Sequence, residues 1–279
     1  MKTVHSAIIA ALILLLALPA QAKGPKGHLV IIGGGKRPAS ITNTIIELAG
    51  GKDAKILGIL TASGVQESTA KDIIKSFSDA GAASVVCIAP TREQSDDPEY
   101  VAKVLDGITG IYFCGGQQNR TVDTLCGTLL HREMDALYQN GAVISGSSAG
   151  AAIMSDPMIT GRRNDGSDIG FNSISANVVN VKKGLGFLKG AIVDQHFIKR
   201  SRENRLLSLA LDNPQYVSFG IDESTAIVVS NGRDIKVEGE STVMVIEPSA
   251  KSVSTDAQGN YRADLKVKLL LAGDTYRIK

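Results

Sequence analysis

Short apolar runs alternate with amphipathic stretches along the first half of the chain. The runs are apolar throughout, as strands are when helices cover both faces of a parallel sheet. We expect strands over residues 28–32, 55–60, 84–89, 108–114 and 142–145, and helices over residues 41–49, 67–80, 98–105 and 121–139. This alternation predicts an α/β fold with a mostly parallel sheet and helices on both faces.

The second half of the chain has a different pattern. Residues 160–190 are polar and rich in Gly, Asn and Ser, which predicts a functional loop or a set of short hairpins. A short strand, a helix and a strand are expected over residues 191–193, 201–211 and 216–221. From Ala226 onward, segments of alternating polarity predict antiparallel strands that complete the sheet or pack beside it. We expect residues 23–279 to form a single catalytic α/β domain.

The N-terminus has the features of a secretory signal. Lys2 precedes an apolar run over residues 7–18, and Ala20-Gln21-Ala22 is an A-x-A cleavage site. The apolar run is short for a membrane-spanning helix. We therefore expect a signal peptide over residues 1–22, a secreted or periplasmic mature protein, and no membrane attachment after its removal.

Charge and composition narrow the function classes. The net charge is +2, Trp is absent and aromatic residues make up 4% of the chain, which argues against a nucleic-acid partner. Three cysteines (Cys87, Cys114 and Cys126) do not form a disulfide framework. The sequence holds no H-x-x-x-H or Cys/His cluster, and the glycines at 33–35 do not form G-x-G-x-x-G, so we expect neither metal nor cofactor. These glycines are expected to let the backbone pass close to a neighbouring loop or to the substrate.

The stretch GAVISGSSAGAAIM, residues 141–154, contains G-x-S-x-G between an expected strand and a helix. Such a sharp turn presents its central residue clear of the backbone, at the positive end of the helix. Ser148 is therefore the candidate nucleophile. The N–H groups of Ala149 and of Gly116, at the end of the neighbouring strand, are candidate oxyanion donors.

A serine nucleophile needs a base, and the chain holds four histidines. His5 belongs to the expected signal peptide, His28 opens the first strand at the wrong end of the sheet, and His131 lies within a helix. His196 follows an apolar strand, so it lies at a strand end like the elbow. Elimination favours His196 as the general base.

The acid that would orient the imidazole is not determined by the residues alone. Asp165 and Asp168 lie between Ser148 and His196, in the irregular segment. Asp194 is two residues from His196 and is a rival, because alternate residues of a strand share a face.

Three arginines follow the candidate base at short intervals: Arg200, Arg202 and Arg205. Guanidinium groups beside a nucleophile suggest bidentate binding of a substrate carboxylate. The alternative is a solvated basic helix face paired with Glu203.

These motifs occur together in one order, and the chain resembles the cyanophycinase family of serine peptidases. The matching pieces span about residue 28 to about residue 230 and read HLVIIGGG, ILTAS, FCGGQQNR, GSSAGAAIM, GLGFLKGAIVDQHFIKRSRENRL and FGIDESTAIVV. The resemblance implies a fold similar to the class I glutamine amidotransferase, or flavodoxin-like, layout.

The resemblance also assigns residues. It implies Ser148 as nucleophile and His196 as base. The family's acid lies shortly after a glycine that Gly161 resembles, which points to Asp165, with Asp168 in reserve; the family more often has Glu there. The implied substrate-pocket residues are Gln118, Asp194, Gln195, Arg200, Arg202 and Arg205.

The activity that the resemblance implies is hydrolysis of cyanophycin, a polyaspartate with arginine on its side chains, to β-Asp-Arg dipeptides. Family members are commonly homodimers and use no metal. Two alternatives stay open: an aspartyl or isoaspartyl dipeptidase acting on small Asp-containing peptides, and a non-catalytic binding protein on the same fold.

Overall fold

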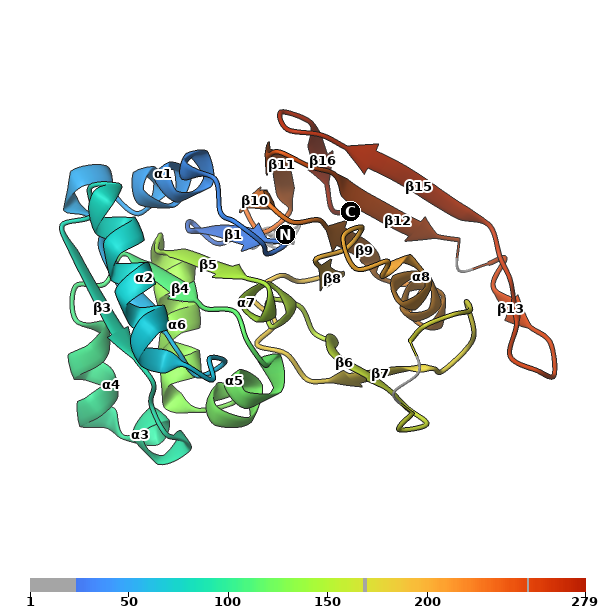
Figure 1. Ribbon diagram of the computed structural model, residues 1–279, viewed down its shortest axis with the longest axis horizontal. Coiled ribbons are helices and arrows are strands. Elements are labelled where there is room, and N and C mark those ends of the chain that lie inside the picture. Colours follow the sequence, from blue (N-terminus) through green and yellow to red (C-terminus); the bar gives the residue numbers. More distant parts are fainter. Residues whose placement is uncertain (1–23, 168–169, 250) are drawn as a thin grey trace, which may run out of the picture.

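The computed structural model describes residues 24–167, 170–249 and 251–279, so the expected signal peptide lies outside the described residues. The described chain forms a large sheet of eight strands, a second sheet of four, and two short strand pairs (Figure 1). The large sheet has the order β16-β11-β10-β1-β5-β4-β2-β3.

Five parallel strands form the centre and one edge of the large sheet. They are β1 (His28–Ile32), β2 (Lys55–Ile59), β3 (Ser84–Ile88), β4 (Gly110–Phe113) and β5 (Val143–Ser147). The central strands β1, β4 and β5 are almost entirely buried, as their unbroken apolar runs require. The predicted mostly parallel sheet is confirmed.

The C-terminal antiparallel strands were predicted either to complete the large sheet or to pack beside it, and they do both. Strands β10 (Thr225–Ser230), β11 (Asp234–Gly239) and β16 (Thr275–Arg277) extend the large sheet beside β1. The second sheet consists of β8 (Ala191–Gln195), β9 (Val217–Ile221), β12 (Val243–Pro248) and β15 (Leu265–Leu270). Strands β8 and β9 are parallel, whereas β12 and β15 are antiparallel to their neighbours.

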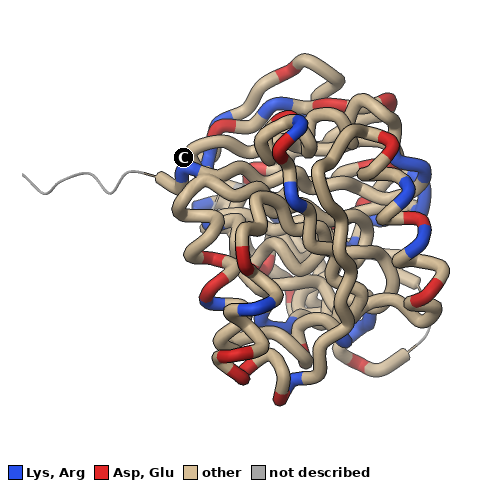
Figure 2. The backbone as a smooth tube through the Cα atoms, turned by 90° about the vertical axis from the view of Figure 1, so that its left-hand side faces the viewer, with Lys and Arg blue, Asp and Glu red and all other residues tan. Residues whose placement is uncertain are grey.

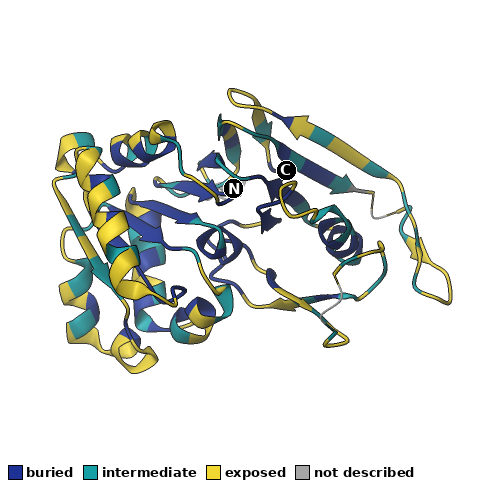
Figure 3. Ribbon diagram, in the orientation of Figure 1, coloured by how far each residue is buried: buried dark blue, intermediate teal, exposed yellow. Residues whose placement is uncertain are grey.

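Helices bury their apolar stripes on both faces of the parallel strands (Figures 1 and 3). On one face, α1 (Ala39–Leu48) and α2 (Gln66–Asp79) pack through residues such as Ile45 and Phe77. On the other, α4 (Pro98–Leu105), α5 (Gln118–Leu125) and α6 (Leu129–Asn140) pack through residues such as Met134. Helix α8 (Glu203–Asp212) covers the second sheet.

One helix prediction was wrong in detail, and one short helix was not predicted. The predicted helix over residues 121–139 is two helices, because Gly127 adopts a φ of +80° and Thr128 caps α6 by accepting the His131 N–H. A short helix that was not predicted, α3 (Arg92–Asp96), precedes α4 and begins with a capping box between Thr91 and Gln94. A 3₁₀ turn, η1 (Gly51–Asp53), precedes β2.

The polar segment 160–190 contains a hairpin, one of its two predicted forms. Strands β6 (Met158–Arg163) and β7 (Val179–Lys182) pair antiparallel across it. A second small hairpin, β13 (Ser254–Thr255) and β14 (Tyr261–Arg262), packs on the same segment, where the Ala176 N–H donates to the Gly259 carbonyl at 2.9 Å.

The surface carries both signs of charge. Figure 2 shows basic and acidic residues interspersed over one side of the molecule. Within the described part of the chain, no helix has the length and apolar character needed to cross a membrane.

Candidate active site

Ser148 lies at the sharp turn between β5 and the single-turn helix α7 (Ala149–Ala152). Its φ of 55° and ψ of −112° place it in a region that non-glycine residues rarely occupy. The turn also explains both glycines of G-x-S-x-G. A Cβ on Gly146 would lie 2.4 Å from the Gly150 carbonyl oxygen, and a Cβ on Gly150 would lie 2.2 Å from that of Phe113. The sequence therefore folds here into an elbow that projects Ser148.

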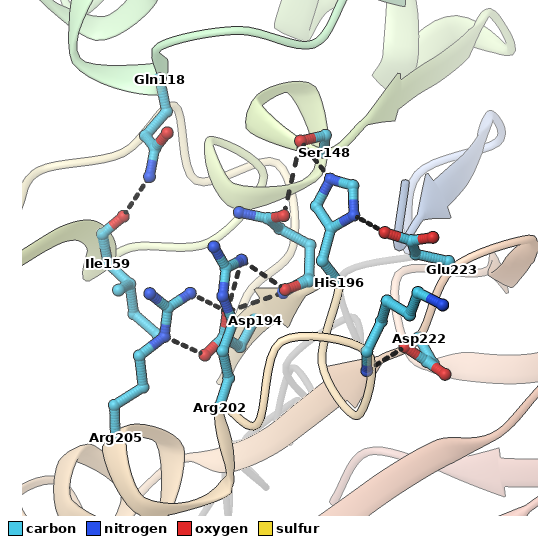
Figure 4. Close-up of polar contacts among 11 residues, drawn as sticks. Gln118, Ser148, Ile159, Asp194, His196, Arg202, Arg205, Asp222 and Glu223 are labelled. Atoms are coloured by element: carbon cyan, nitrogen blue, oxygen red, sulfur yellow. Dashed lines mark hydrogen bonds and ion pairs between the residues drawn. The ribbon is translucent and has the colours of Figure 1, made fainter. Parts of the chain in front are cut away.

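His196 comes to Ser148 from the second sheet. It directly follows β8, and its Nε2 lies 2.8 Å from Ser148 Oγ (Figure 4). Its backbone N–H donates to the Gly33 carbonyl at 2.6 Å, which ties the turn after β8 to the end of β1. The ring is thus within hydrogen-bond reach of the hydroxyl proton, as a general base must be.

Glu223 completes the line of polar groups. Its Oε1 lies 2.5 Å from His196 Nδ1. Glu223 lies between β9 and β10, where the chain passes from the second sheet to the large sheet. With Nδ1 bonded to a carboxylate, the neutral imidazole presents Nε2 as an acceptor to Ser148. Ser148, His196 and Glu223 have the geometry of a serine hydrolase triad.

The prediction of Asp165 as the acid beside His196 was wrong. Asp165 is exposed, and its carboxylate accepts bonds from Arg163 Nη2 at 2.9 Å and Ser167 Oγ at 2.7 Å. These donors hold the pKa of Asp165 well below its usual range. The reserve candidate Asp168 lies outside the described residues.

The sequence did contain a signal for Glu223. The predicted strand over residues 216–221 ends at Asp222-Glu223, so an acid follows a strand end just as His196 does. The three candidate acids, Asp165, Asp168 and Asp194, all lie between Ser148 and His196 in the chain. A triad acid need not lie there, because the order of triad members along a chain is not fixed by their geometry.

Gly33-Gly34-Gly35 lets the backbone pass close to the candidate base and acid. A Cβ on Gly34 would lie 2.4 Å from His196 Cε1, and a Cβ on Gly35 would lie 2.8 Å from Glu223 Cβ. Both glycines also have positive φ, +113° and +69°. The expected close approach to a neighbouring loop is confirmed: the glycines approach the turn after β8, which carries His196, and the turn after β9, which carries Glu223.

The predicted oxyanion donors lie around the nucleophile. Ala149 follows Ser148 as the first residue of α7. The position of a Cβ on Gly115 lies 3.5 Å from Ser148 Cβ, so the turn after β4 reaches the elbow. Gly116 has a φ of +135° and packs against the Ala62 carbonyl, where a Cβ would lie only 2.1 Å away. The donor roles of Gly116 and Ala149 stay predictions.

Asp194 and Arg205 form a buried ion pair below the triad. They are 1% and 5% exposed, and Arg205 Nε donates to Asp194 Oδ2 at 2.6 Å (Figure 4). Arg205 Nη2 also donates to Asp194 Oδ1. The pair joins β8 to α8. The expectation that Arg205 binds a substrate carboxylate is therefore corrected, because its guanidinium faces Asp194, and Asp194 is thereby also removed as a rival acid for His196.

The other predicted pocket residues have separate positions. Gln195 Oε1 lies 3.4 Å from Ser148 Oγ, and Arg202 Nη1 donates to the Gln195 carbonyl at 2.6 Å. Arg200 is exposed. Gln118, at the start of α5, donates through Nε2 to the Ile159 carbonyl at 3.0 Å.

The surroundings of His196 favour its neutral form. Burial lowers the pKa of the imidazole, and the positive charges of Arg200 and Arg202 lower it further, whereas the bond to Glu223 raises it. The balance keeps this pKa below the ordinary value of 6.5, so His196 can accept a proton at neutral pH. Among the described residues, no group of three or more His, Cys, Asp or Glu side chains could hold a metal ion.

Comparison with known proteins identifies the family to which the chain belongs. The family model described as peptidase family S51 matches residues 29–237. A cyanophycinase from Geminocystis herdmanii (strain PCC 6308) is 31% identical over 268 residues, which cover 91% of this chain and 94% of the relative. A cyanophycinase from Synechococcus elongatus is 30% identical over 270 residues, 93% of this chain and 81% of the relative.

Solved structures with the same fold are also peptidases by name. A peptidase from an acI-B1 Actinobacterium superposes with a TM-score of 0.67 at 25% identity, covering 90% of this chain and 96% of that one. A putative peptidase E protein from Listeria monocytogenes EGD-e shares the fold, with a TM-score of 0.53 at 15% identity over 77% of this chain and 99% of its own. The chain therefore belongs to peptidase family S51 and is a serine peptidase.

Proposed function

We propose that this protein is an exported exopeptidase that hydrolyses cyanophycin to β-Asp-Arg dipeptides. The observation that carries the proposal is the hydrogen-bonded line from Ser148 through His196 to Glu223. The chain that carries this line is 30–31% identical to two cyanophycinases over 91–93% of its length.

Each of the three hydrogen-bonded residues has a defined chemical role. Ser148 Oγ attacks the carbonyl carbon that joins one β-Asp-Arg unit to the next, while His196 Nε2 takes the hydroxyl proton. Glu223 holds the ring and stabilises the imidazolium that forms. His196 then protonates the leaving amine, and water hydrolyses the acyl-enzyme by the same steps in reverse. The N–H groups of Ala149 and Gly116 stabilise the oxyanion.

Substrate recognition in this proposal uses the groups around the elbow that remain available. Arg200 is exposed and Arg202 is partly exposed beside Gln195, so their guanidinium groups can bind substrate carboxylates. Gln118 and Gln195 supply amide groups. Asp194 and Arg205 support this surface from below.

The proposal includes export and dimer formation. Cyanophycin is too large to cross a membrane, which suits an enzyme with a signal peptide over residues 1–22 and a secreted or periplasmic location. N-terminal sequencing of the exported protein should begin at Lys23. Sedimentation of the purified protein should give the mass of a homodimer.

The test of the activity is mass spectrometry of products from purified cyanophycin. Wild type should release β-Asp-Arg, and Ser148→Ala should not. Ser147→Ala is the matched control, because it removes the neighbouring hydroxyl of the same turn. Equal dipeptide release by wild type and Ser148→Ala would contradict the mechanism.

Two further measurements distinguish the alternatives. Turnover of Asp-containing or isoaspartyl dipeptides with intact polymer would select a small-peptide enzyme. Tight ligand binding without labelling of Ser148 by a fluorophosphonate would indicate a binding protein instead.

A further inference from the structure

The loop after β1 contacts both the base and the acid of the proposed triad. Gly33 accepts a hydrogen bond from the His196 N–H at 2.6 Å, and Gly34 accepts one from the Ser224 N–H at 2.9 Å. Ser224 Oγ also donates to the Lys36 carbonyl at 2.7 Å. Because Ser224 directly follows Glu223, the position of this loop sets the positions of both His196 and Glu223.

Three consecutive glycines cannot hold such a loop in place by themselves. Glycine has the largest backbone freedom of any residue, so the conformation of this loop must be fixed from its two ends. The first end is fixed, since β1 pairs with β5 on one side and β10 on the other. At the second end, Gly35 and Lys36 are exposed. Arg37 is the next residue.

Arg37 has many side-chain contacts for a residue at the edge of the molecule. Its Nε donates to Thr42 Oγ1 at 2.9 Å and its Nη2 donates to Ser76 Oγ at 2.7 Å. Its guanidinium carbon lies 4.7 Å from the ring centroids of both Phe77 and Tyr112. Such cation–π contacts are stronger where the cation is desolvated.

These contacts fix the loop to rigid parts of the fold. Phe77 is fully buried in α2, and Tyr112 belongs to β4, where it pairs with Ser145 of the elbow strand β5. The two rings themselves pack edge to face at 5.2 Å. The guanidinium thus connects the glycine loop to a helix and to the strand beside the nucleophile's own strand.

We propose that Arg37 is a positioning residue for the reaction: by fixing the loop 33–36, it holds His196 and Glu223 in line with Ser148. This inference rests on the proposed function for its kinetic consequences. Its geometric part concerns the His196–Glu223 contact and can be tested without a substrate. The rival role is that Arg37 only joins α1 to α2 and contributes to stability.

The test compares Arg37→Met with wild type, with Arg132→Met as the control, since Arg132 is an exposed arginine of α6 that donates to the carbonyl of Gly127, just before that helix. Proton NMR should show a far-downfield resonance from His196 Nδ1–H in wild type, assigned by its loss in Glu223→Gln. We expect it to broaden or disappear in Arg37→Met and to persist in Arg132→Met.

Reaction rates give a second measurement. Fluorophosphonate labelling of Ser148 and kcat on cyanophycin should fall roughly 10- to 100-fold in Arg37→Met, with KM unchanged, because small misplacement of reacting groups has effects of this size. The midpoint of the pH dependence of labelling should move to lower pH. Glu223 raises the pKa of His196, and the other charged groups near the ring, Arg200 and Arg202, lower it.

Phe77→Leu, which removes one of the two rings that Arg37 contacts, should produce the same changes in smaller degree and serves if Arg37→Met does not fold. An unchanged downfield resonance and pH midpoint, with only a lower melting temperature, would overturn the proposal. If wild type neither labels nor hydrolyses cyanophycin, the proposed function fails, but the resonance still decides whether Arg37 positions His196.

Discussion

The orientation of the His196 ring depends on one carboxylate. Glu223 is the acidic side chain bonded to the imidazole, and it is 28% exposed, so water reaches one side of it. A partly exposed acid can still fix a ring when the bond is short and both residues are held by the backbone. Here Gly33 bonds the His196 N–H and Gly34 bonds the N–H of Ser224, which follows Glu223.

Replacing Glu223 by Gln should therefore lower kcat/KM by roughly 10²- to 10⁴-fold, as loss of the orienting acid does in serine hydrolases. Gln keeps the size of the side chain but favours the wrong tautomer of His196. The matched control is Asp165→Asn, the same chemical change at the carboxylate bonded to Arg163. Hydrolysis rates of the two variants should differ; equal losses would mean that Asp165 also acts in the reaction.

The pH dependence of kcat/KM should rise through a midpoint below 6.5. Only neutral His196 can accept the Ser148 proton, and burial holds the pKa of this imidazole below 6.5. Removing the charge in Glu223→Gln should shift the midpoint further down, because Glu223 raises this pKa. A midpoint above 7 in the wild-type profile would show that the imidazolium is stabilised more than the ring is desolvated.

At the residue scale, the sequence predicted two of the three side chains that lie in line, Ser148 and His196, but not Glu223. G-x-S-x-G has a local geometric cause, so Ser148 could be identified from its neighbours alone. His196 was found by elimination among four histidines. Among many carboxylates no such elimination was available, and the contact to Glu223 depends on how β9 and β10 join two different sheets.

At the scale of elements, the loop after β1 shows how glycine serves a site built from other segments. Gly34→Ala should reduce activity at least 100-fold, since its Cβ would lie 2.4 Å from the His196 ring, and a displacement of about 1 Å can have that effect. Gly81→Ala is the control: Gly81 also has a positive φ, +93°, but nothing lies within 4 Å of its Cβ position. Loss of labelling of Ser148 in both variants would point to backbone strain instead.

The buried pair between β8 and α8 should be measurable in stability. Arg205→Met should lower the free energy of unfolding by about 3–5 kcal/mol, because it leaves Asp194 charged and buried. The surface pair Lys182–Asp123 provides the comparison, and Lys182→Met should change stability by less than about 1 kcal/mol. Urea unfolding measures both; similar effects would mean that Arg202, 3.8 Å from Asp194, compensates for the loss.

Element boundaries could be predicted where the signal is local. The helix α4 begins and ends where the pattern placed it, with Asp97 and Pro98 marking its start. The break between α5 and α6 was missed because their apolar spacing continues across Gly127. The sequences of β6 and β7 lack periodicity, and the pairing of these two strands in one hairpin depends on contacts across a long polar segment.

At the scale of the whole molecule, the α/β class follows from the order of apolar runs, but their division into two sheets does not. The strand sequences of β10 and β12 both contain four consecutive apolar residues, yet β10 joins the large sheet and β12 the second. The choice is made by packing: β10 fits beside β1, and β12 beside β9. Such long-range pairings leave little trace in a single sequence.

The division between two sheets also determines when activity can begin. Ser148 is held by the large sheet, whereas His196 ends a strand of the second sheet, and Glu223 is reached only after most of the chain has been made. The three side chains therefore meet only when both sheets have formed and docked. Under the proposed export, a chain that crossed the membrane unfolded would have no assembled triad during transit, so its folding on the far side would itself switch the peptidase on.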